Sequence, residues 1–351
     1  MARENKTFVL AERPKTHIVP GETFKLEKAP APTADDLKDG QVLLESLYLS
    51  LDPAMRGWLN DTRSYLPPVQ IGEKMRGGTV SRVIASKSDL AKEGDVVTAF
   101  IGWTEVAIAG EKDIQKLEIP KGGQATDLLG VLGLTGMTAW TGLERIGKPK
   151  AGETVVVSGA AGATGSVVGQ IAKLRGCRVV GIAGSDDKCA WLTSELGFDA
   201  ALNYKSASFR KDFAAATPDF IDVFWDNVGG EILEVALGRA KQNARFVMCG
   251  SISGYNEPGK EGKGIRNLFN VITMRIRMEG FIVFDFVEDF PRARKEIGEW
   301  LAEGKLKRKE TIVTGGLEKA EFAIRDLFEG KNTGKLLVEV KPADQVRGAK
   351  L

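Results

Sequence analysis

The chain is poor in the side chains that hold metals and form disulfides. Its 351 residues include three cysteines, Cys177, Cys189 and Cys249, and one histidine, His17. No two cysteines form a CxxC pair, which disfavours a disulfide scaffold and a cysteine-rich zinc site. A Ser-His-Asp hydrolase would have to use His17 alone, and we expect that histidine to lie on the surface instead. We expect the three thiols to be inert, because none has an obvious base beside it in the sequence.

Long apolar runs and an excess of one charge are also missing. No stretch of roughly 18 apolar residues occurs, and the first residues, MARENKTFVLAERP, lack the apolar core of a secretion signal. The formal net charge is +2, with lysine and arginine spread along the chain, whereas nucleic-acid binders usually concentrate basic charge on one face. We therefore expect a cytoplasmic protein that binds neither membrane nor nucleic acid. The length of the chain predicts two domains.

The two parts of the chain differ in pattern. Residues 1 to about 125 contain short apolar or alternating runs between turn formers, which predict a compact, barrel-like β domain with strands at 41–50, 78–86 and 95–100. From residue 126 onward strand-like and helix-like segments alternate, which predicts an α/β domain with a parallel sheet covered on both faces. Its expected strands are 155–157, 178–183, 200–204, 221–225 and 245–249. Helices are expected at 166–175, 186–196, 290–306 and 317–329, and one starts within 128–143. A last strand, 335–340, is expected to return to the first domain.

Three glycines mark the turn between the first strand of the alternating part and the helix after it. Residues 155–169 read VVVSGAAGATGSVVG, with Gly159, Gly162 and Gly165 spaced three apart. Glycine permits a tight turn and the close approach of a pyrophosphate, and a helix that begins near Gly165 would point free N–H groups at that phosphate. This variant of the GxGxxG fingerprint predicts dinucleotide binding. The alternative is that the glycines serve packing alone.

The end of the next strand indicates which dinucleotide is bound. An NAD-selective site places an acid there, about 20 residues downstream of the glycines, to bind the ribose hydroxyls. Here the strand ends in VGIAGS, without an acid. We interpret Asp186 and Asp187, which follow, as the N-cap and first-turn acids of the next helix. Lys188 could then pair with a 2′-phosphate, or be a solvated helix lysine, and the sequence favours NADP over NAD.

Ordered motifs along the chain identify a family. They are 51–57 (LDPAMRG), 133–140 (GLTGMTAW), 162–173 (GATGSVVGQIAK), 184–188 (GSDDK), 196–199 (LGFD), 203–205 (NYK), 226–230 (DNVGG) and 249–256 (CGSISGYN). Over nearly its whole length the chain resembles the medium-chain dehydrogenase/reductase superfamily, and within it the zinc-free branch of prostaglandin reductases and alkenal double-bond reductases. The resemblance implies a GroES-like domain of residues 1–130 and 311–351, a Rossmann NADP-binding domain of residues 131–310, and an active site between them. Where zinc alcohol dehydrogenases have a Gly-His-Glu segment, this chain has EKM at 73–75, which supplies no ligand.

The resemblance also implies the residues of the cofactor site. Lys188 and Tyr204 would hold the adenosine 2′-phosphate, residues 162–165 would face the pyrophosphate, and Asn332 would close over the cofactor. Asn227 and residues 249–255 would line it towards the nicotinamide. The implied cofactor-binding residues are Gly162, Ala163, Thr164, Gly165, Lys188, Tyr204, Asn227, Cys249, Gly250, Ser251, Ile252, Ser253, Tyr255, Phe281, Ile282, Val283, Asn332 and Thr138.

The implied reaction is the NADPH-dependent reduction of the carbon–carbon double bond of a small α,β-unsaturated ketone or aldehyde. A hydride would reach the β-carbon, and hydrogen-bond donors rather than zinc would stabilise the enolate oxygen. Tyr255 is the candidate catalytic donor, and the alternative is that it only packs over the cofactor. Ala54 and Trp140 stand where family members commonly have tyrosine. Both are expected near the substrate cleft, where Ala54 would leave more room.

Other interpretations stay open at the level of sequence. The same fold could carry out quinone reduction. It also occurs in lens proteins and RNA-binding proteins that bind NADPH with little turnover, so a non-catalytic role is a second alternative. A homodimer is the family default, and the strand around 277–283 either extends a sheet across the two-fold axis or ends the sheet of one subunit. The substrate entrance could be lined by Met55, Arg56 and Trp58. Alternatively, Met55 fills core space and Arg56 pairs with an acid between the domains. Residues 255–266 form either a lid or a plain surface loop.

Overall fold

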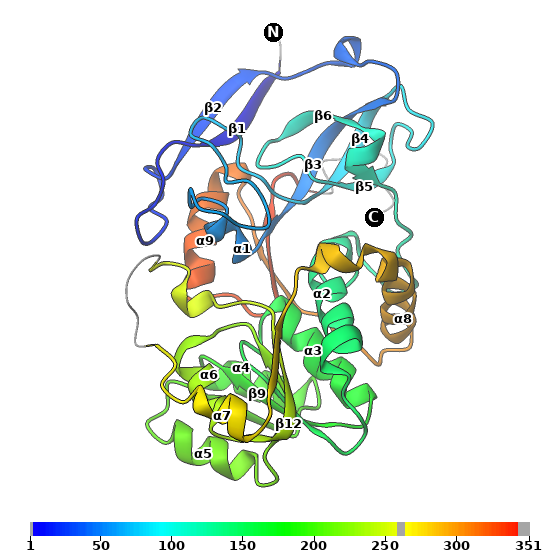
Figure 1. Cartoon of the computed structure of the whole chain (residues 1–351). Helices are drawn as coiled ribbons and strands as arrows, with labels where there is room; N and C mark the ends of the chain where they lie inside the picture. The colour runs from blue at the N-terminus through cyan, green and yellow to red at the C-terminus, as the bar shows by residue number, and fades with distance from the viewer. Residues whose placement is uncertain (1–2, 258–263, 343–351) are drawn as a thin grey trace. The chain divides into compact units, whose positions relative to one another are not determined.

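The computed structural model describes residues 3–257 and 264–342. The chain divides into two compact units, which Figure 1 shows in one view. Unit 1 contains the chain up to Ile119, Gly123–Leu129 and the chain from Glu310 onward. Unit 2 contains Pro120–Gly122 and Gly130–Lys309. Unit 1 is thus assembled from segments at both ends of the sequence, whereas unit 2 is almost continuous.

Unit 1 is built mainly of antiparallel strands. In its described residues β1 and β2 form a hairpin, and a seven-stranded sheet has the order β14-β15-β3-β4-β5-β7, with β6 also paired to β3. Within that sheet β14 and β15 run parallel to each other. The strands are β1 (Glu4–Leu10), β2 (Phe24–Pro30), β3 (Gln41–Leu51), β4 (Thr79–Ser86), β5 (Val96–Ala99), β6 (Val106–Gly110), β7 (Ile114–Gln115), β14 (Glu310–Val313) and β15 (Lys335–Glu339). The helices are α1 (Ala54–Gly57) and α9 (Ala320–Phe328), with 3-10 turns at Ala34–Asp36, Glu111–Asp113, Ala125–Leu128 and Leu317–Lys319.

The long strand β3 is the centre of unit 1. It pairs with β4, β6 and β15, and nearly all of its residues are buried. The rings of Phe8, Phe24 and Trp103 pack together in the core with centroids 5.0 to 6.4 Å apart, and Ile324 of α9 lies in the same cluster. Strand β15 therefore returns to the β-rich part of the chain, as the sequence predicted.

A buried carboxylate joins three segments of unit 1. Glu45 of β3 is 4% exposed, and it accepts hydrogen bonds from Arg3, Arg82 and Lys341 over 2.6 to 3.1 Å. Burial by itself raises the pKa of Glu45, but the hydrogen bonds and charges of Lys341 and Arg3 outweigh it, so the pKa is lower than usual. The ionised carboxylate ties the residue before β1, strand β4 and the residues after β15 to the middle of the sheet.

Unit 2 is a doubly wound parallel sheet. Among the described residues its six strands have the order β10-β9-β8-β11-β12-β13, and every neighbouring pair is parallel. Numbered along the chain this is 3-2-1-4-5-6, the Rossmann order, which confirms the predicted fold class. The strands are β8 (Thr154–Val157), β9 (Arg178–Ala183), β10 (Ala200–Asn203), β11 (Ile221–Asp226), β12 (Ala240–Met248) and β13 (Arg277–Gly280).

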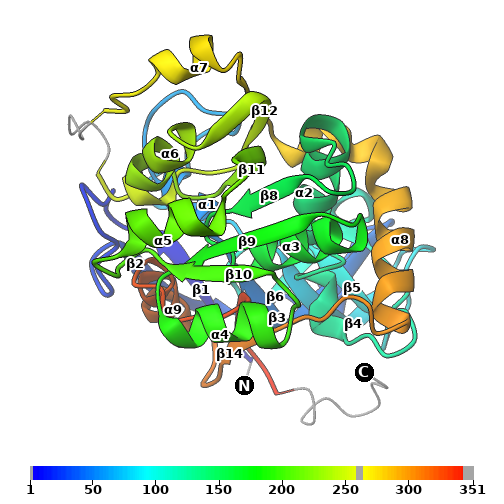
Figure 2. The ribbon, with the colours of Figure 1, turned by 90° about the horizontal axis from the view of Figure 1, so that it is seen from below.

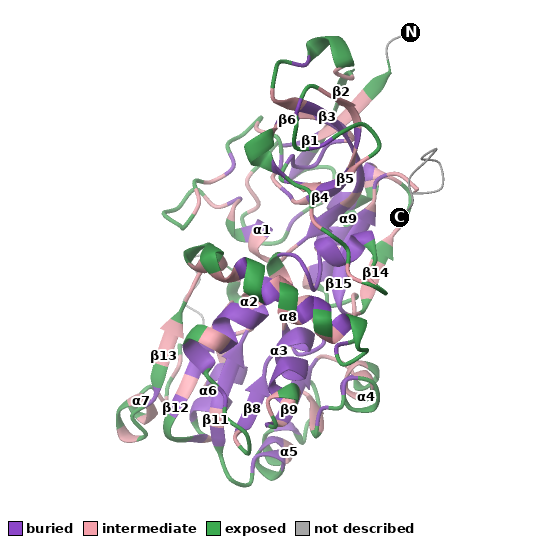
Figure 3. Ribbon diagram, turned by 90° about the vertical axis from the view of Figure 1, so that its right-hand side faces the viewer, coloured by how far each residue is buried: buried purple, intermediate pink, exposed green. Residues whose placement is uncertain are grey.

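Helices cover both faces of this sheet. In Figure 2 α5 and α6 lie on one face and α3 on the other. Phe213 of α5 and Ala236 of α6 pack against Phe224 and Val156 of the sheet. Because both faces are covered, β8 and most of β11 are buried along their length, as the purple segments of Figure 3 show. The helices are α2 (Leu134–Gly142), α3 (Ala163–Leu174), α4 (Asp186–Ser194), α5 (Phe209–Ala216), α6 (Gly230–Leu237), α7 (Phe269–Thr273) and α8 (Phe290–Ala302), with a π-helical turn at Leu143–Gly147 and 3-10 turns at Ile252–Gly254 and Val283–Asp289.

Several element ends differ from the sequence prediction. Helix α3 begins at Ala163, near Gly165 but three residues before the expected range 166–175, because the extended Gly162 (φ −82°, ψ 175°) is its N-cap. Strand β13 ends at Gly280, so the strand predicted over 277–283 is too long. The helix expected within 128–143 begins only at Leu134. Across residues 3–257 and 264–342, every helix is too short or too polar to traverse a bilayer.

Candidate cofactor site

The glycine-rich turn joins β8 to α3. Gly159 has φ +57°, a conformation that residues with a side chain rarely adopt, and the Gly162 amide donates to its carbonyl over 3.0 Å. A Cβ added at Gly165 would lie 2.9 Å from Ala160 Cα and closer still to the Gly159 carbonyl oxygen. Gly162 is the N-cap of α3 and has no side chain to cap the first-turn amides, which are therefore open to an anion. Gly165 lies in that first turn, so the fingerprint extends into the helix.

A buried acid ties this turn to two neighbouring loops. Asp226, the last residue of β11, is fully buried, and its Oδ1 accepts from Ser158 Oγ over 2.7 Å and from the amides of residues 228 and 229 over 2.9 Å. Its carbonyl oxygen accepts the amides of residues 249 and 250. Burial raises the pKa of the Asp226 carboxyl, although the hydrogen bonds that its Oδ1 accepts favour the ionised form. One residue thus fixes the loops after β8, β11 and β12, at the carboxyl ends of the strands where doubly wound sheets bind ligands.

The side chain of Asn227 braces the same region. Its Nδ2 donates to the Ser158 carbonyl over 2.7 Å, and its Oδ1 accepts from Trp225 Nε1 over 3.0 Å. Both ends of the amide are therefore engaged by the protein. The predicted role of Asn227 in lining the cofactor stays a prediction, and its clear structural role is to hold the glycine-rich turn.

The segment after β12 carries the candidate catalytic residue. Asp226 fixes Cys249 and Gly250. Ser251 is the N-cap of the 3-10 turn, Ile252 and Ser253 lie within it, and Tyr255 is its C-cap. The Tyr255 hydroxyl oxygen accepts the Ser251 amide over 3.1 Å, so the position of the hydroxyl is set by the turn. Tyr255 is half-buried, and residues 258–263 of the predicted lid lie outside the described residues.

Lys188 and Tyr204 lie near the end of β9. The N-cap of α4 is Ser185, whose backbone is extended (φ −158°, ψ 158°) and whose Oγ accepts the Lys188 amide over 3.4 Å. The sequence interpretation of Asp186 as the N-cap is therefore wrong, and Asp186 is a first-turn acid. Burial, and then the charge of Lys205, lower the pKa of Lys188. Tyr204 is 45% exposed, and its ring lies beside Gly184, whose added Cβ would come within 3.2 Å of it.

The structure places the remaining cofactor candidates in different surroundings. The Phe281 ring packs edge-on against Trp225 with centroids 5.9 Å apart, and Ile282 and Val283 follow at the start of a 3-10 turn. The Thr138 hydroxyl donates to the Leu134 carbonyl of its own helix over 2.7 Å. Asn332 belongs to unit 1, where its Nδ2 donates to the Gly334 carbonyl over 2.8 Å. The roles of these residues towards a cofactor stay predictions.

Trp140 is wrongly assigned to the substrate cleft. Its side chain is fully buried in unit 2, its Nε1 donates to Glu296 of α8 over 2.9 Å, and the Arg292 guanidinium lies 5.0 Å from the centre of its ring. The tryptophan therefore packs α2 against α8 instead of contacting a ligand.

Arg56 also differs from its predicted role. It is fully buried, and it donates to the carbonyls of Pro14 and Thr16 and to the side chain of Asn60 over 2.6 to 3.0 Å. It binds neutral oxygens within unit 1, not an acid between the domains, and its burial lowers the pKa of the guanidinium. Met55 fills core space as predicted, and His17 is exposed as predicted.

Ser158 and Asp226 are the functional residues that sequence reasoning missed. Asp226 was visible only as the first letter of the DNVGG motif, at the end of a buried apolar strand. An acid at the carboxyl end of such a strand is a usable signal, because a charge is costly to bury without hydrogen-bond donors. The serine before the glycine turn is the donor that faces it.

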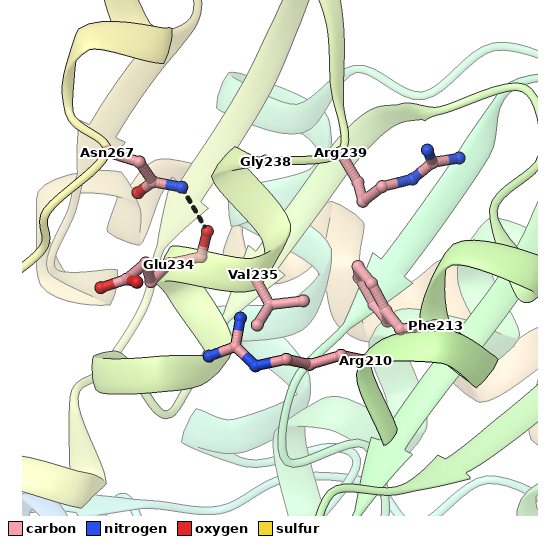
Figure 4. Close-up of a pocket in the computed structure, with 7 residues that line it drawn as sticks. All are labelled: Arg210, Phe213, Glu234, Val235, Gly238, Arg239 and Asn267. Carbon is pink, nitrogen blue, oxygen red and sulfur yellow. Dashed lines mark hydrogen bonds between the residues drawn. The ribbon is translucent and has the colours of Figure 1, made fainter. Parts of the chain in front are cut away.

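A hollow of about 220 Å³ is lined by residues of α5, α6 and the segments that follow α6 (Figure 4). Gly238 and Arg239 of its lining directly precede β12 at the amino end of that strand. Ligands in doubly wound sheets bind at the carboxyl ends. Within the hollow Arg210 pairs with Glu231 and Glu234 with Arg266, while Arg239 donates to the Thr217 carbonyl and stacks on the Phe220 ring. The hollow is therefore not the cofactor site.

Comparison with known proteins agrees with this architecture. The family described as "N-terminal domain of oxidoreductase" matches residues 6–117, and that described as "Zinc-binding dehydrogenase" matches residues 163–299. Despite the second description, no group of three His, Cys, Asp or Glu side chains in residues 3–257 and 264–342 is placed to hold a metal.

Two relatives and one solved structure cover most of the chain. The NADPH-dependent curcumin reductase of Escherichia coli (strain K12) is 42% identical over 348 residues, which is 97% of this chain and 99% of that protein. Prostaglandin reductase 1 of Mus musculus is 42% identical over 307 residues, 86% of this chain and 90% of that protein. The crystal structure of CurA from Vibrio vulnificus in complex with NADPH is 39% identical, with a TM-score of 0.87 over 96% of this chain and 99% of that one. The chain belongs to the prostaglandin, alkenal and curcumin reductase branch of the medium-chain dehydrogenase/reductase superfamily.

Proposed function

We propose that the protein is an NADPH-dependent reductase that saturates the carbon–carbon double bond of small α,β-unsaturated ketones and aldehydes. The observation that carries this proposal is the glycine-rich turn at the switch point of a Rossmann sheet, in a chain that matches curcumin and prostaglandin reductases over most of its length. The end of β9 supports NADP over NAD, because a lysine and a tyrosine, and not a capping acid, lie beside it.

The residues present fit a dinucleotide. The close approach at Gly165 leaves no room for a side chain, and the first-turn amides of α3 suit an anionic pyrophosphate. Residues 162–165 would hold the pyrophosphate and Lys188 with Tyr204 the 2′-phosphate. Asn227, residues 249–255, Phe281, Ile282, Val283, Thr138 and Asn332 would complete the site. When bound, NADPH supplies the hydride that reduces the substrate.

The chain's own contribution to the chemistry would centre on Tyr255. The Ser251 amide fixes the phenol oxygen, so Tyr255 is a candidate donor whose position is set before a substrate carbonyl arrives. As negative charge builds on that carbonyl oxygen, a donor held in advance stabilises it, which is the task zinc performs in metal-dependent relatives. The described residues offer no set of metal ligands, so we propose a zinc-independent reaction.

Tyr255→Phe tests this role. The ring is kept and one donor is lost, so we expect kcat with an enone to fall roughly 100-fold while the dissociation constant for NADPH stays within a few fold. A variant that keeps full turnover would show that Tyr255 only packs over the cofactor.

We further propose a homodimer joined through unit 2. Strand β13 is the last strand of the sheet order, and the adjacent helix α7 exposes Phe269 (70%) and Ile272 (71%). An open sheet edge beside exposed apolar side chains suits a second copy across a two-fold axis. Sedimentation velocity of the protein and of an Ile272→Lys variant tests this, because a monomeric wild type would refute it. The three unpaired thiols suit a reducing compartment, so we place the protein in the cytoplasm, which cell fractionation would check.

The deciding assay offers NADPH, or separately NADH, with a panel of enones, alkenals and quinones. Oxidation of the reduced cofactor is followed by absorbance, and products are identified by mass spectrometry, with and without a zinc chelator. A saturated carbonyl product, formed faster with NADPH and unaffected by the chelator, is the expected result. Turnover of quinones alone would replace double-bond reduction with quinone reduction, and tight NADPH binding without turnover of any compound would indicate a non-catalytic protein.

A further inference from the structure

The carboxyl end of β9 is covered by the segment that follows β10. The Tyr204 amide donates to the Ala183 carbonyl over 3.1 Å, which continues the strand pairing past β10. A Cβ added at Gly184 would lie 3.2 Å from the Tyr204 ring and 3.7 Å from Lys205 Cε. Tyr204 and Lys205 therefore both reach the strand tip, although only the first is expected at the cofactor from family resemblance.

Asn203, the last residue of β10, organises this corner through both ends of its amide. Its Nδ2 donates to Asp186 Oδ1 over 2.9 Å, and its Oδ1 accepts the Lys205 amide over 3.0 Å. The first bond holds the carboxylate of the α4 first turn at β10. The second bond is an Asx-type turn that sets the backbone direction of Lys205. A single side chain thus restrains one acid and one lysine.

The charges around this corner are arranged for a doubly charged anion. Lys188 and Lys205 are close enough that the charge of Lys205 contributes to lowering the pKa of Lys188, after burial. Lys205 also lies 5.8 Å from the centre of the Tyr204 ring. Two ammonium groups repel each other unless an anion lies near both. Asn203 holds the Asp186 carboxylate of the α4 first turn at this corner, and a carboxylate there would repel such an anion. The acid that binds the ribose hydroxyls of NAD in a Rossmann fold lies close by, at the end of the second strand.

We propose that Asn203 determines cofactor selectivity by holding the Asp186 carboxylate away from the ribose and by directing Lys205 to join Lys188 at the 2′-phosphate. This rests on the proposed use of NADPH. Asn203 is a positioning residue, whereas Lys205 contacts the phosphate. Loss of the Asn203 amide frees a carboxylate that repels a 2′-phosphate and can accept a ribose hydroxyl, so the preference shifts towards NAD.

The test measures binding of adenosine fragments by calorimetry, without any turnover. We expect Asn203→Ala to weaken 2′,5′-ADP roughly 5- to 30-fold, as one repulsive charge at a few ångströms allows, and to leave 5′-AMP unchanged or slightly tighter. Lys205→Ala should weaken 2′,5′-ADP to a similar extent without changing 5′-AMP. Lys211→Ala, which removes an exposed lysine of α5, is the matched control and should change neither.

Two further variants separate the two bonds of Asn203. Asn203→Asp keeps the acceptor for the Lys205 amide but repels Asp186, and it should weaken 2′,5′-ADP at least as much as Asn203→Ala. In an Asp186→Ala background the effect of Asn203→Ala should shrink several fold. Unchanged 2′,5′-ADP binding in Asn203→Ala, or an undiminished effect in that background, would overturn the proposal. If the wild type bound 2′,5′-ADP no better than 5′-AMP, the proposed use of NADPH itself would fail, which is a different outcome.

Discussion

Replacing Gly165 by alanine is the most direct perturbation of the glycine-rich turn. The added Cβ would lie 2.9 Å from Ala160 Cα, whereas ordinary van der Waals contact begins at 3.4 Å. The turn must therefore open by at least about 0.5 Å (3.4 − 2.9), and the approach to the Gly159 carbonyl asks for more. Because Gly165 sits in the first turn of α3, the opening moves the amides that we propose to face the pyrophosphate.

Overpacking of this kind typically costs about 1–3 kcal/mol. If the turn relaxes in the free protein, NADPH must restore the strained shape, and its dissociation constant rises about 5- to 150-fold, since about 1.4 kcal/mol corresponds to a factor of ten. If the turn cannot relax, the same free energy is lost from the stability of unit 2. Calorimetric titration measures the loss in NADPH affinity, and a thermal melt of the free protein measures the loss in stability, so together they give the total free-energy cost of the added methyl group.

Two other glycines provide matched controls. Gly169→Ala lies in the same helix, but its Cβ would overlap the Phe198 ring away from the turn, so we expect a lower melting temperature with unchanged affinity in the folded protein. Gly298→Ala lies in α8 with the nearest atoms 3.7 Å away in Pro120, and it should be neutral or up to about 1 kcal/mol more stable. A Gly165→Ala protein with the melting temperature and NADPH affinity of the wild type would refute the packing argument.

Three further predictions concern buried ionisable groups. Glu45→Gln should destabilise unit 1 by about 3 kcal/mol at pH 7, because three cations lose their carboxylate partner. The pKa of Glu45 is lowered in the folded state, so the difference in unfolding free energy between variant and wild type should shrink as pH falls below about 4. Denaturant titrations over this pH range would show it. Burial raises the pKa of Asp226 in the folded state above the value of about 3.9 that an aspartate has in the unfolded chain, so its ionisation opposes folding. The free energy of unfolding of Asp226→Asn, relative to that of the wild type, should therefore improve from pH 4 to pH 7. Burial raises the pKa of Cys177 to about 11 and that of Cys249 to about 12. Iodoacetamide at neutral pH should therefore modify the buried Cys177 only after unfolding and the half-buried Cys249 more slowly than a free thiol, as mass spectrometry can show.

The interior of unit 2 could be predicted because each buried parallel strand is a short apolar run between turns. Strands β8, β9 and β11 lie within a residue of their expected ends. Two edge strands were harder, although β10, also at an edge, lies within a residue of its expected bounds. One side of an edge strand faces solvent, so its apolar pattern can fade. β14, with the sequence ETIV, was missed for this reason, and the run after Arg277 was extended past Gly280 by apolar residues that instead begin a 3-10 turn.

The site was predicted where a local backbone requirement selects a residue type, and missed where the partner is distant. Gly165 is visible in the sequence because only glycine fits the close approach. Ser158 and Asp226 are 68 residues apart, so their hydrogen bond is a product of the tertiary fold. Arg56 binds carbonyls 40 and 42 residues away, which no charge pattern indicates. The N-cap of α4 was assigned to Asp186 and not to Ser185, and residue type alone does not correct this because serine and aspartate cap helices equally well.

The pairing of β15 with β3 has a consequence for biosynthesis. Leu336 lies opposite Leu51, so the two strands leave the ribosome 285 residues (336 − 51) apart, about 15–60 s at ordinary elongation rates. Unit 2 is complete once Lys309 has emerged, before either of the last two strands exists. During that interval residues 48–51 of β3 lack their β15 partner in the nascent chain, and they are the segment we expect chaperones to shield. Ribosomes stalled just before and just after β15 should differ in the protease resistance of the first hundred or so residues.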